Sequence, residues 1–440
     1  MKTRVAGPLL LTLLALAGSP AHALLEMSES GATRFEASAQ ESPFAAKLRT
    51  GHEALRKLDY ARADALFDEA ARLDPRSPLP ALGHAESARI RNLPDDVQKW
   101  LKHALEVAPR NADALTAWGR WQYARKHFPD AEKAWKAAIA ADPKAALPLV
   151  DLGDLNYNIR RNADLAADFY RRALQLNPRL GGAHYALGTI WLDKKNPGDA
   201  IGEFEAAIGL SPGNPLPLHG LGLALQMQQD FKGAHAAFDR ALAANADYDP
   251  ARLAKGDVFL AQGDVQRAIA EYQTVARAQP KRYDAQLKLG MAHQRAGQLR
   301  EAQTAYQAAV RIDPERPLPY NNMAWMAAED SARPSDAVLD WARKAVALAP
   351  KVADFQDTLG WVHYKRGEMA AAIAVLEKVS RAEGRGAAGI HHRLGLAYAA
   401  AGRPRDAVAA FRTALRLDPN FTDAADARAQ LARLDSPAKP

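Results

Sequence analysis

The stretch LGTIWLDKKNPGDAIGEFEAAIGLSP, residues 187–212, decides the fold of this chain because its landmarks return along the sequence at a nearly fixed interval. Its glycine, Gly188, is one of a series in which neighbouring members are 34 or 35 residues apart. The series consists of Gly119, Gly153, Gly188, Gly222, Gly256 and Gly290. A period near 34 residues indicates a solenoid of stacked helix pairs. Such a fold presents a long surface for binding and seldom encloses a catalytic pocket.

The proline that closes the stretch, Pro212, recurs with the same period. A proline cannot continue a helix, because it lacks the backbone N–H and its ring collides with the preceding turn. We therefore expect each recurring proline to separate one helix from the next. Its counterparts are Pro75, Pro109, Pro143, Pro178, Pro280, Pro314, Pro350 and Pro419, with Ala246 and Gly384 at the two places where proline is missing.

The third landmark is an alanine followed four residues later by a bulky side chain, as in Ala200 and Phe204. Residues four apart share one face of a helix. The alanine is expected to let a neighbouring helix approach, while the bulky residue fills the space beside it. The other pairs are Ala63/Phe67, Ala131/Trp135, Ala166/Tyr170, Ala234/Phe238, Ala268/Tyr272, Ala302/Tyr306, Ala337/Trp341, Ala372/Leu376 and Ala407/Phe411.

Leu-Gly, a downstream aromatic residue, Ala-x3-aromatic and then Pro is the tetratricopeptide repeat pattern. The chain resembles that family through eleven copies between about Phe44 and Phe421. The resemblance implies an all-α fold: a right-handed superhelical solenoid of about eleven antiparallel helix-turn-helix repeats over residues 44–421. We expect a flexible lead-in at 24–43, a capping helix at 422–434 and a disordered tail at 435–440.

Three copies depart from the pattern. In the second, extra residues are expected around Asn92-Leu93-Pro94. The ninth has Ala324 in place of the glycine and a longer loop through Ser331 and Pro334. The tenth ends in glycines at 384 and 386 instead of a proline. The repeat pattern therefore leaves the boundaries of these three repeats open.

The N-terminus has the three parts of a secretory signal peptide. Lys2 and Arg4 precede a short apolar run, and Ala21-His22-Ala23 is a cleavage site of small residues. We expect cleavage near Ala23 and a periplasmic or secreted protein; an uncleaved membrane anchor is the alternative. Because the chain has no cysteine, it lacks the residue that a bacterial lipoprotein carries at its cleavage site. Any membrane association would then act through a partner.

Composition argues against several other functions. The 58 Lys and Arg residues and 51 Asp and Glu residues alternate along the helices, as on a solvated surface, so no nucleic-acid partner is expected. The histidines are scattered, and no phosphate-binding loop, metalloprotease motif or serine-nucleophile motif occurs. The sequence therefore predicts neither a catalytic site nor a bound metal or cofactor, and we expect a protein that is not an enzyme.

The remaining candidate site is the groove that the resemblance implies on the concave side of the solenoid. In the resembling family the first helix of each pair lines this side. The groove residues expected here are Arg120, Tyr123, Asp154, Tyr157, Asn158, Tyr185, Asn321, Trp325, Asp357, Trp361 and Tyr364, with His219, Asp257, Gln294 and Arg295 on the same face. Aromatic rings beside amides and carboxylates can hold an extended peptide or a sugar chain. The alternative is that the rings only pack between adjacent repeats.

Two family ligand-binding patterns are absent. Lysine–asparagine pairs that clamp a peptide carboxylate are missing, and only Asn322 stands where relatives fused to a sugar transferase carry a ladder of asparagines. Residues 321–325 and 357–361 resemble later repeats of exported bacterial relatives, some of them linked to polysaccharide export. We therefore expect a scaffold that binds proteins or extended peptides in bacterial envelope assembly or secretion; the alternative is a component of exopolysaccharide synthesis or export that binds the polymer.

Overall fold

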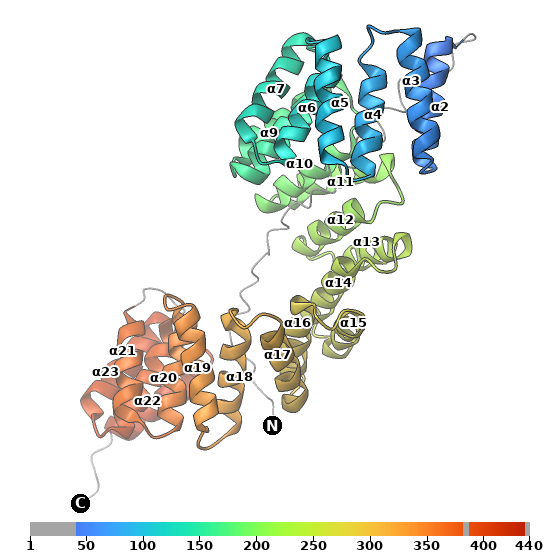
Figure 1. Ribbon diagram of the computed structural model, residues 1–440. Coiled ribbons are helices and arrows are strands. Elements are labelled where there is room, and N and C mark those ends of the chain that lie inside the picture. Colours follow the sequence, from blue (N-terminus) through green and yellow to red (C-terminus); the bar gives the residue numbers. More distant parts are fainter. Residues whose placement is uncertain (1–40, 382–386, 436–440) are drawn as a thin grey trace, which may run out of the picture. The chain divides into compact units, whose positions relative to one another are not determined.

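The computed structural model describes residues 41–381 and 387–435, and these residues contain helices and turns but no strand (Figure 1). The expectation of an all-α tetratricopeptide-type solenoid is confirmed. The expected signal peptide, nearly all of the lead-in, the glycines at 384 and 386, and the residues after 435 lie outside the described part of the chain.

The chain forms two compact units that divide between Ala246 and Asp247. The N-terminal unit holds α2 (Pro43–Arg56), α3 (Tyr60–Leu73), α4 (Leu79–Ile90), α5 (Pro94–Val107), α6 (Ala112–Ala124), α7 (Phe128–Ala141), α8 (Leu147–Asp154), the π-helix η1 (Leu155–Ile159), α9 (Ala163–Leu176), α10 (Gly181–Asp193), α11 (Pro197–Leu210), α12 (Pro215–Met227) and α13 (Phe231–Ala244). Within it, each even-numbered helix packs against the next odd-numbered one.

The C-terminal unit continues the same alternation. It holds α14 (Asp249–Ala261), α15 (Val265–Ala278), α16 (Tyr283–Arg295), α17 (Leu299–Ile312), α18 (Pro317–Asp330), α19 (Asp336–Leu348), α20 (Ala353–Lys365), α21 (Met369–Ser380), α22 (Ala388–Ala400), α23 (Pro404–Leu417) and α24 (Ala424–Asp435). We call the even-numbered helices from α2 to α22 first helices and their partners second helices. The last helix, α24, packs on the final pair, where Ala427 is fully buried in one cluster with Phe411.

Short polar residues and prolines define the helix ends. The Asp230 carboxylate accepts a hydrogen bond from the backbone N–H of Gly233 at 2.9 Å and so caps α13. Helix α11 ends at Leu210, just before Pro212, and α12 then begins at Pro215. The recurring proline therefore lies between helices, because neither neighbour can extend through it.

The periodic glycines make room for the periodic rings. Phe204 is fully buried, and an ideal Cβ added to Gly188 would lie 2.7 Å from its Cε1 atom. A Cβ on Gly220, in the first helix of the next pair, would lie 2.5 Å from the same atom. The ring thus occupies the place of two missing side chains and joins one repeat to the next.

The ninth pair corrects the expected register. The sequence pattern predicts Ala337 and Trp341 as its buried pair, but Ala337 is exposed and Trp341 is only half-buried. Val338 and Ala342 are the buried residues. The longer loop before α19 shifts the pattern by one residue, and a one-residue shift turns a helix by about 100°.

The second pair has no extra residues, contrary to the expectation around Asn92. The turn between its helices places Asn92 in the left-handed region at φ 56°, as the neighbouring turns do with Leu58 and Lys126. These three residues are evenly spaced in the sequence, so the repeat has the ordinary length. What differs is the buried pair, which is Val97 and Leu101 instead of alanine and a ring.

Candidate functional site

The predicted groove residues lie on first helices in two groups, one in each unit. In the N-terminal unit, Arg120 of α6 reaches to α8 and donates from Nε to both carboxylate oxygens of Asp151, at 2.9 Å each. Asp151 is buried, which raises its pKa, while the Arg120 charge opposes the rise. Arg120 therefore neutralises a carboxylate of the next repeat and has its Nε atom committed to that contact.

Asp154 is a strongly perturbed group of this first cluster. The hydroxyl of Tyr170, in the second helix α9, donates to its Oδ1 atom at 2.6 Å. Burial raises the pKa of Asp154 to about 7, and the nearby Asp151 charge adds to the rise. Asp154 therefore changes charge near neutral pH, which the sequence pattern gave no reason to expect.

The helix that carries Asp154 continues as the π-helix η1, which contains Tyr157 and Asn158. The Tyr157 hydroxyl donates to Asp193 of the following first helix. Asn156, which sequence reasoning missed, is buried within η1 and donates from Nδ2 to the carbonyl oxygen of Leu152 at 2.7 Å. Its Oδ1 atom has no hydrogen-bond partner among the described residues. Single-turn π-helices are frequent at functional sites.

The other two aromatic residues of this group contribute mainly to packing. Tyr123 contacts Phe128 and Trp135, with ring centroids 5.4 and 5.9 Å away. Burial raises the pKa of Tyr123, and a hydrogen bond with Asn158 acts in the opposite direction. Tyr185 lies 5.8 Å from the ring of Phe204, and burial raises its pKa as well. These two rings therefore belong partly to the core between the first and second helices.

The C-terminal group is joined by an arginine that sequence reasoning missed. Arg393 of α22 donates from Nε to Oδ1 of Asp357 in α20 at 2.7 Å, and its second nitrogen binds the other carboxylate oxygen. Its guanidinium also lies 5.3 Å from the ring centroid of Trp325 in α18. Residues of three successive first helices therefore meet at one side chain. Arg393 lies at a position that is not one of the landmarks of the repeat pattern. Its role in this group therefore follows only from its contacts in the structure.

Two further aromatic residues of this group stack on each other. Trp361 and Tyr364 have ring centroids 5.0 Å apart and an interplanar angle of 15°. The indole N–H of Trp361 donates to Glu329 at the end of α18 at 2.7 Å. Both rings are half-buried. The two rings pack between adjacent repeats, and they also leave part of their surface exposed. Both the packing role and the binding role considered from the sequence therefore fit part of their environment.

The remaining predicted polar residues lie in different environments. Asp257 accepts from the hydroxyl of Tyr272 at 2.7 Å and from Lys288 at 2.7 and 2.8 Å. His219 is buried, and burial lowers its pKa to about 4, so it is neutral at pH 7. Asn321 is half-buried, and its Oδ1 atom has no hydrogen-bond partner among the described residues.

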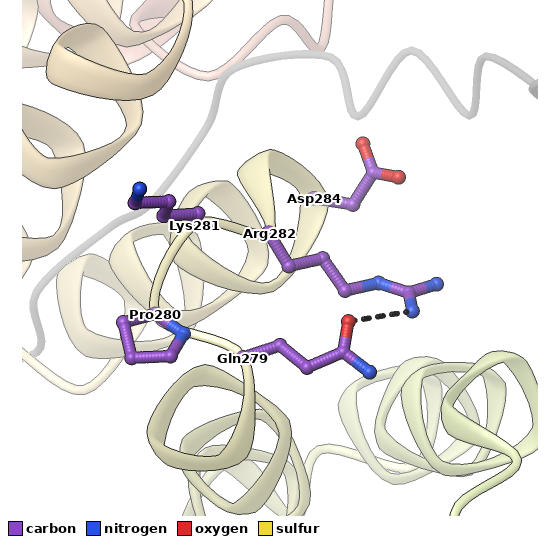
Figure 2. A pocket seen from close by; sticks show the side chains of 5 residues that line it. All are labelled: Gln279, Pro280, Lys281, Arg282 and Asp284. Carbon is purple, nitrogen blue, oxygen red and sulfur yellow. Dashed lines mark hydrogen bonds between the residues drawn. The ribbon is translucent and has the colours of Figure 1, made fainter.

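A pocket of about 630 Å³ lies at the turn between α15 and α16, lined by Gln279, Pro280, Lys281, Arg282 and Asp284 (Figure 2). Gln279 and Arg282 lie side by side there, joined by a hydrogen bond of 3.4 Å. Both also donate to the buried carboxylate of Asp249 at the start of α14. The polar groups of this pocket thus fix one turn against another. No group of three or more potential metal ligands occurs among the described residues.

None of the helices in the described part of the chain combines the length and the apolar character needed to cross a bilayer.

Comparison with known families identifies the repeat. A tetratricopeptide repeat model matches residues 116–181, 181–215, 219–283, 253–317 and 287–353, which together exceed half of the chain. A second tetratricopeptide repeat model matches residues 388–421. The first two helix pairs lie outside the matched ranges.

Individual relatives are distant. Anaphase-promoting complex subunit 3 of Schizosaccharomyces pombe is 23% identical over 254 residues, which are 57% of this chain and 37% of the relative. The crystal structure of the APC/C hetero-tetramer Cut9–Hcn1 aligns with 88% of this chain and 96% of its own at 16% identity and a TM-score of 0.47. PilF of Pseudomonas aeruginosa aligns with 47% of this chain and 93% of its own at 21% identity and a TM-score of 0.43. The chain spans well under half the length of the curated relatives it matches.

Proposed function

The chain belongs to the tetratricopeptide repeat family, and we propose that it is a non-enzymatic scaffold that binds segments of other proteins along its first helices. The repeats stack local units into a long surface, which suits an extended partner better than a small substrate. Curated relatives named as subunits of the anaphase-promoting complex are consistent with such a role.

The observation that carries the proposal is the C-terminal group of residues on α18, α20 and α22. Trp325, Trp361 and Tyr364 are each half-buried, so they expose ring surface beside the charged pair of Arg393 and Asp357. Half-exposed aromatic rings held in place by neighbouring polar groups are typical anchors of protein interfaces. We propose this group as the principal contact for a bound segment.

The test is capture of partners by crosslinking, followed by mass spectrometry, for the native chain and for the double variant Trp325→Ala/Trp361→Ala. The matched control is Trp191→Ala, which also removes a half-buried first-helix tryptophan. The Trp191 ring lies against Arg171 of α9 and Lys194, outside the predicted groove set. Circular dichroism verifies that all variants remain folded.

We expect partners to be lost with the double variant and retained with the control. If the same proteins are captured by all three chains, the first-helix site is wrong. If no protein is captured and a carbohydrate polymer binds the native chain instead, the protein-scaffold proposal fails and the alternative of polysaccharide binding replaces it.

We also propose that the chain acts outside the cytoplasm, in envelope assembly or secretion, after cleavage near Ala23. The support is the order of basic residues, apolar run and small-residue cleavage site in the first 23 residues. N-terminal sequencing of the protein from a periplasmic fraction tests this. A mature chain that begins at Leu24 is the expected result, and a full-length chain found only in the cytoplasmic fraction contradicts it.

A further inference from the structure

The turns between first and second helices differ in chemistry between the two units. Except for the longer turn between α18 and α19, each of these turns has one residue in the left-handed region, where glycine is free of the strain that most other residues carry. In the described part of the C-terminal unit glycine fills this position, and in the N-terminal unit other residues do. The glycines are Gly263, Gly297, Gly367 and Gly402, and the other residues are Leu58, Asn92, Lys126, Arg161, Lys195 and Gln229.

Three consecutive turns of the N-terminal unit place a cation at this strained position. Lys126, Arg161 and Lys195 have φ values of 63°, 56° and 56°, and all three are exposed. None forms an ion pair with another residue of the described chain. A side chain that is strained, exposed and unpaired contributes no folded-state contact to offset the strain. Backbone strain of this kind is concentrated at functional sites.

The residue before each strained position shows how the turns are arranged. Arg160 pairs with Glu132 near the start of α7, and Lys194 pairs with Asp164 near the start of α9. Each pair joins one turn to the second helix that begins directly after the preceding turn. The three turns therefore lie next to one another along one edge of the unit. Arg160 and Lys194 are neutralised by these ion pairs and Arg125 lies over the ring of Trp121, while Lys126, Arg161 and Lys195 form no ion pair with another described residue.

We propose that this basic edge, formed by Lys126, Arg161 and Lys195, docks an extended acidic segment of a partner protein. The surface is formed by turns and is separate from the first-helix site proposed above. It would hold the partner by charge, whereas the aromatic residues would hold it by apolar contact. Charge complementarity of this kind chiefly increases the association rate and the specificity.

The spacing of charge favours a peptide over a uniform polyanion. The free cations recur once per helix pair. Packed helices lie about 8–10 Å apart, so neighbouring cations are separated by at least the length of about three extended residues. The carboxylates of Glu132 and Asp164 lie at the same edge, because they pair with Arg160 and Lys194 of these turns. A nucleic-acid strand carries a charge about every 3.4 Å and would bring phosphates against these carboxylates. A segment with an acidic residue at every third position matches the edge without that repulsion.

The experiment compares two triple variants of the full chain. Lys126→Gly/Arg161→Gly/Lys195→Gly removes three charges and three strained residues. Leu58→Gly/Asn92→Gly/Gln229→Gly removes three strained residues of the same unit and no charge. The probe is a fluorescent peptide of about twelve residues with glutamate at every third position. A peptide with glutamine in those places, a single-stranded oligonucleotide and a heparin oligosaccharide serve as comparisons.

We expect the native chain and the uncharged triple variant to bind the glutamate peptide equally, and the charged triple variant to bind it at least about tenfold more weakly at low salt. Neither variant should melt below the native chain, because glycine fits the left-handed turn. Arg161→Asn provides a second reduced-charge variant, since asparagine also tolerates this conformation.

Three results would overturn the proposal. The first is equal binding of the glutamate peptide by all the chains, including no binding by any of them. The second is an equal loss of binding in both triple variants, which would assign the effect to the turn backbone. The third is tighter binding of the oligonucleotide or the heparin oligosaccharide than of the peptide, which would assign the edge to another class of partner. None of these results bears on the first-helix site.

Discussion

At the residue scale, stability rests on the fit between a missing side chain and a ring. In the second pair the glycine position is Ala85, and the residue that replaces the ring is Leu101, which is also buried. In the tenth pair Gly360 faces Leu376, whose Cγ atom would lie 2.6 Å from an added Cβ. The second pair therefore changes both positions together, whereas in the tenth pair leucine takes the place of the ring against an unchanged glycine and still fills the space, as close packing requires.

Glycine substitutions measure this fit directly. Gly188→Ala should destabilise the fold by about 1–3 kcal/mol, because the new methyl group collides with Phe204. Gly202→Ala is the matched control, because Gly202 is exposed in the interior of α11 and has nothing within 4 Å of an added Cβ. That change should stabilise by about 0.5–1 kcal/mol. Urea unfolding at equilibrium measures both, and changes of the same sign would refute the packing role of Gly188.

The raised pKa of Asp154 predicts a dependence of stability on pH. The unfolded chain loses this proton near pH 4, whereas the folded chain keeps it until pH about 7. The contribution of protonated Asp154 to the stability of the folded state is therefore fully present below pH 4 and is lost as the pH rises through 7. Asp154→Asn keeps an acceptor for Tyr170 and removes the titration.

Urea midpoints at pH 5 and pH 7.5 test this expectation. The free energy of unfolding of Asp154→Asn, relative to that of the native chain, should be higher at pH 7.5 than at pH 5. Because the same histidines titrate in both chains, the comparison isolates Asp154. An identical difference in unfolding free energy at the two pH values would show that Asp154 titrates far from neutrality.

At the scale of elements, the ninth pair solves the packing problem in a different way. Ala324 replaces the glycine in α18 and Ala342 replaces the ring in α19, and both are fully buried in one cluster. Two alanines thus take the place of a glycine, which has no side chain, and a large ring. Half-buried Trp341 packs against the same cluster.

A double-mutant cycle tests whether the two alanines compensate for each other. Ala342→Phe alone should destabilise the fold by about 1–3 kcal/mol, because the ring meets the Cβ of Ala324. Adding Ala324→Gly should recover about 1–2 kcal/mol through coupling between the two sites. Thermal and urea unfolding of the four chains supply the cycle. Additive effects would mean that the residues at positions 324 and 342 do not compensate for each other in size.

At the scale of the whole molecule, each helix pair contacts mainly its neighbours in sequence within its own unit. In such an architecture stability is approximately a sum of repeat terms and nearest-neighbour terms. Ion pairs between successive first helices contribute to the interaction between neighbouring repeats. Examples are Arg120 with Asp151 and Lys288 with Asp257. Damage to one pair should therefore remain local.

Hydrogen exchange measured by mass spectrometry tests this locality. Phe204→Ala should cost about 3–5 kcal/mol and should speed exchange in α10, α11 and α12. Helices α16 to α23 of the C-terminal unit should keep their protection. Phe204→Leu, which retains much of the volume, should show a smaller effect in the same three helices. Equal loss of protection throughout the chain would show that the molecule unfolds as a single cooperative unit.

The fold class could be predicted from the amino-acid sequence, because the prolines and the glycine–ring fit act within one repeat or between adjacent repeats and recur with a constant period. The sequence also placed Trp325, Asp357 and Trp361 on first helices. It did not determine the register of the ninth pair, which depends on the length of the preceding loop. Only the tertiary structure brought Arg393 to Trp325 and Asp357, raised the pKa of Asp154 and aligned the turn cations. These features arise from contacts between repeats, where residues far apart in the sequence become neighbours.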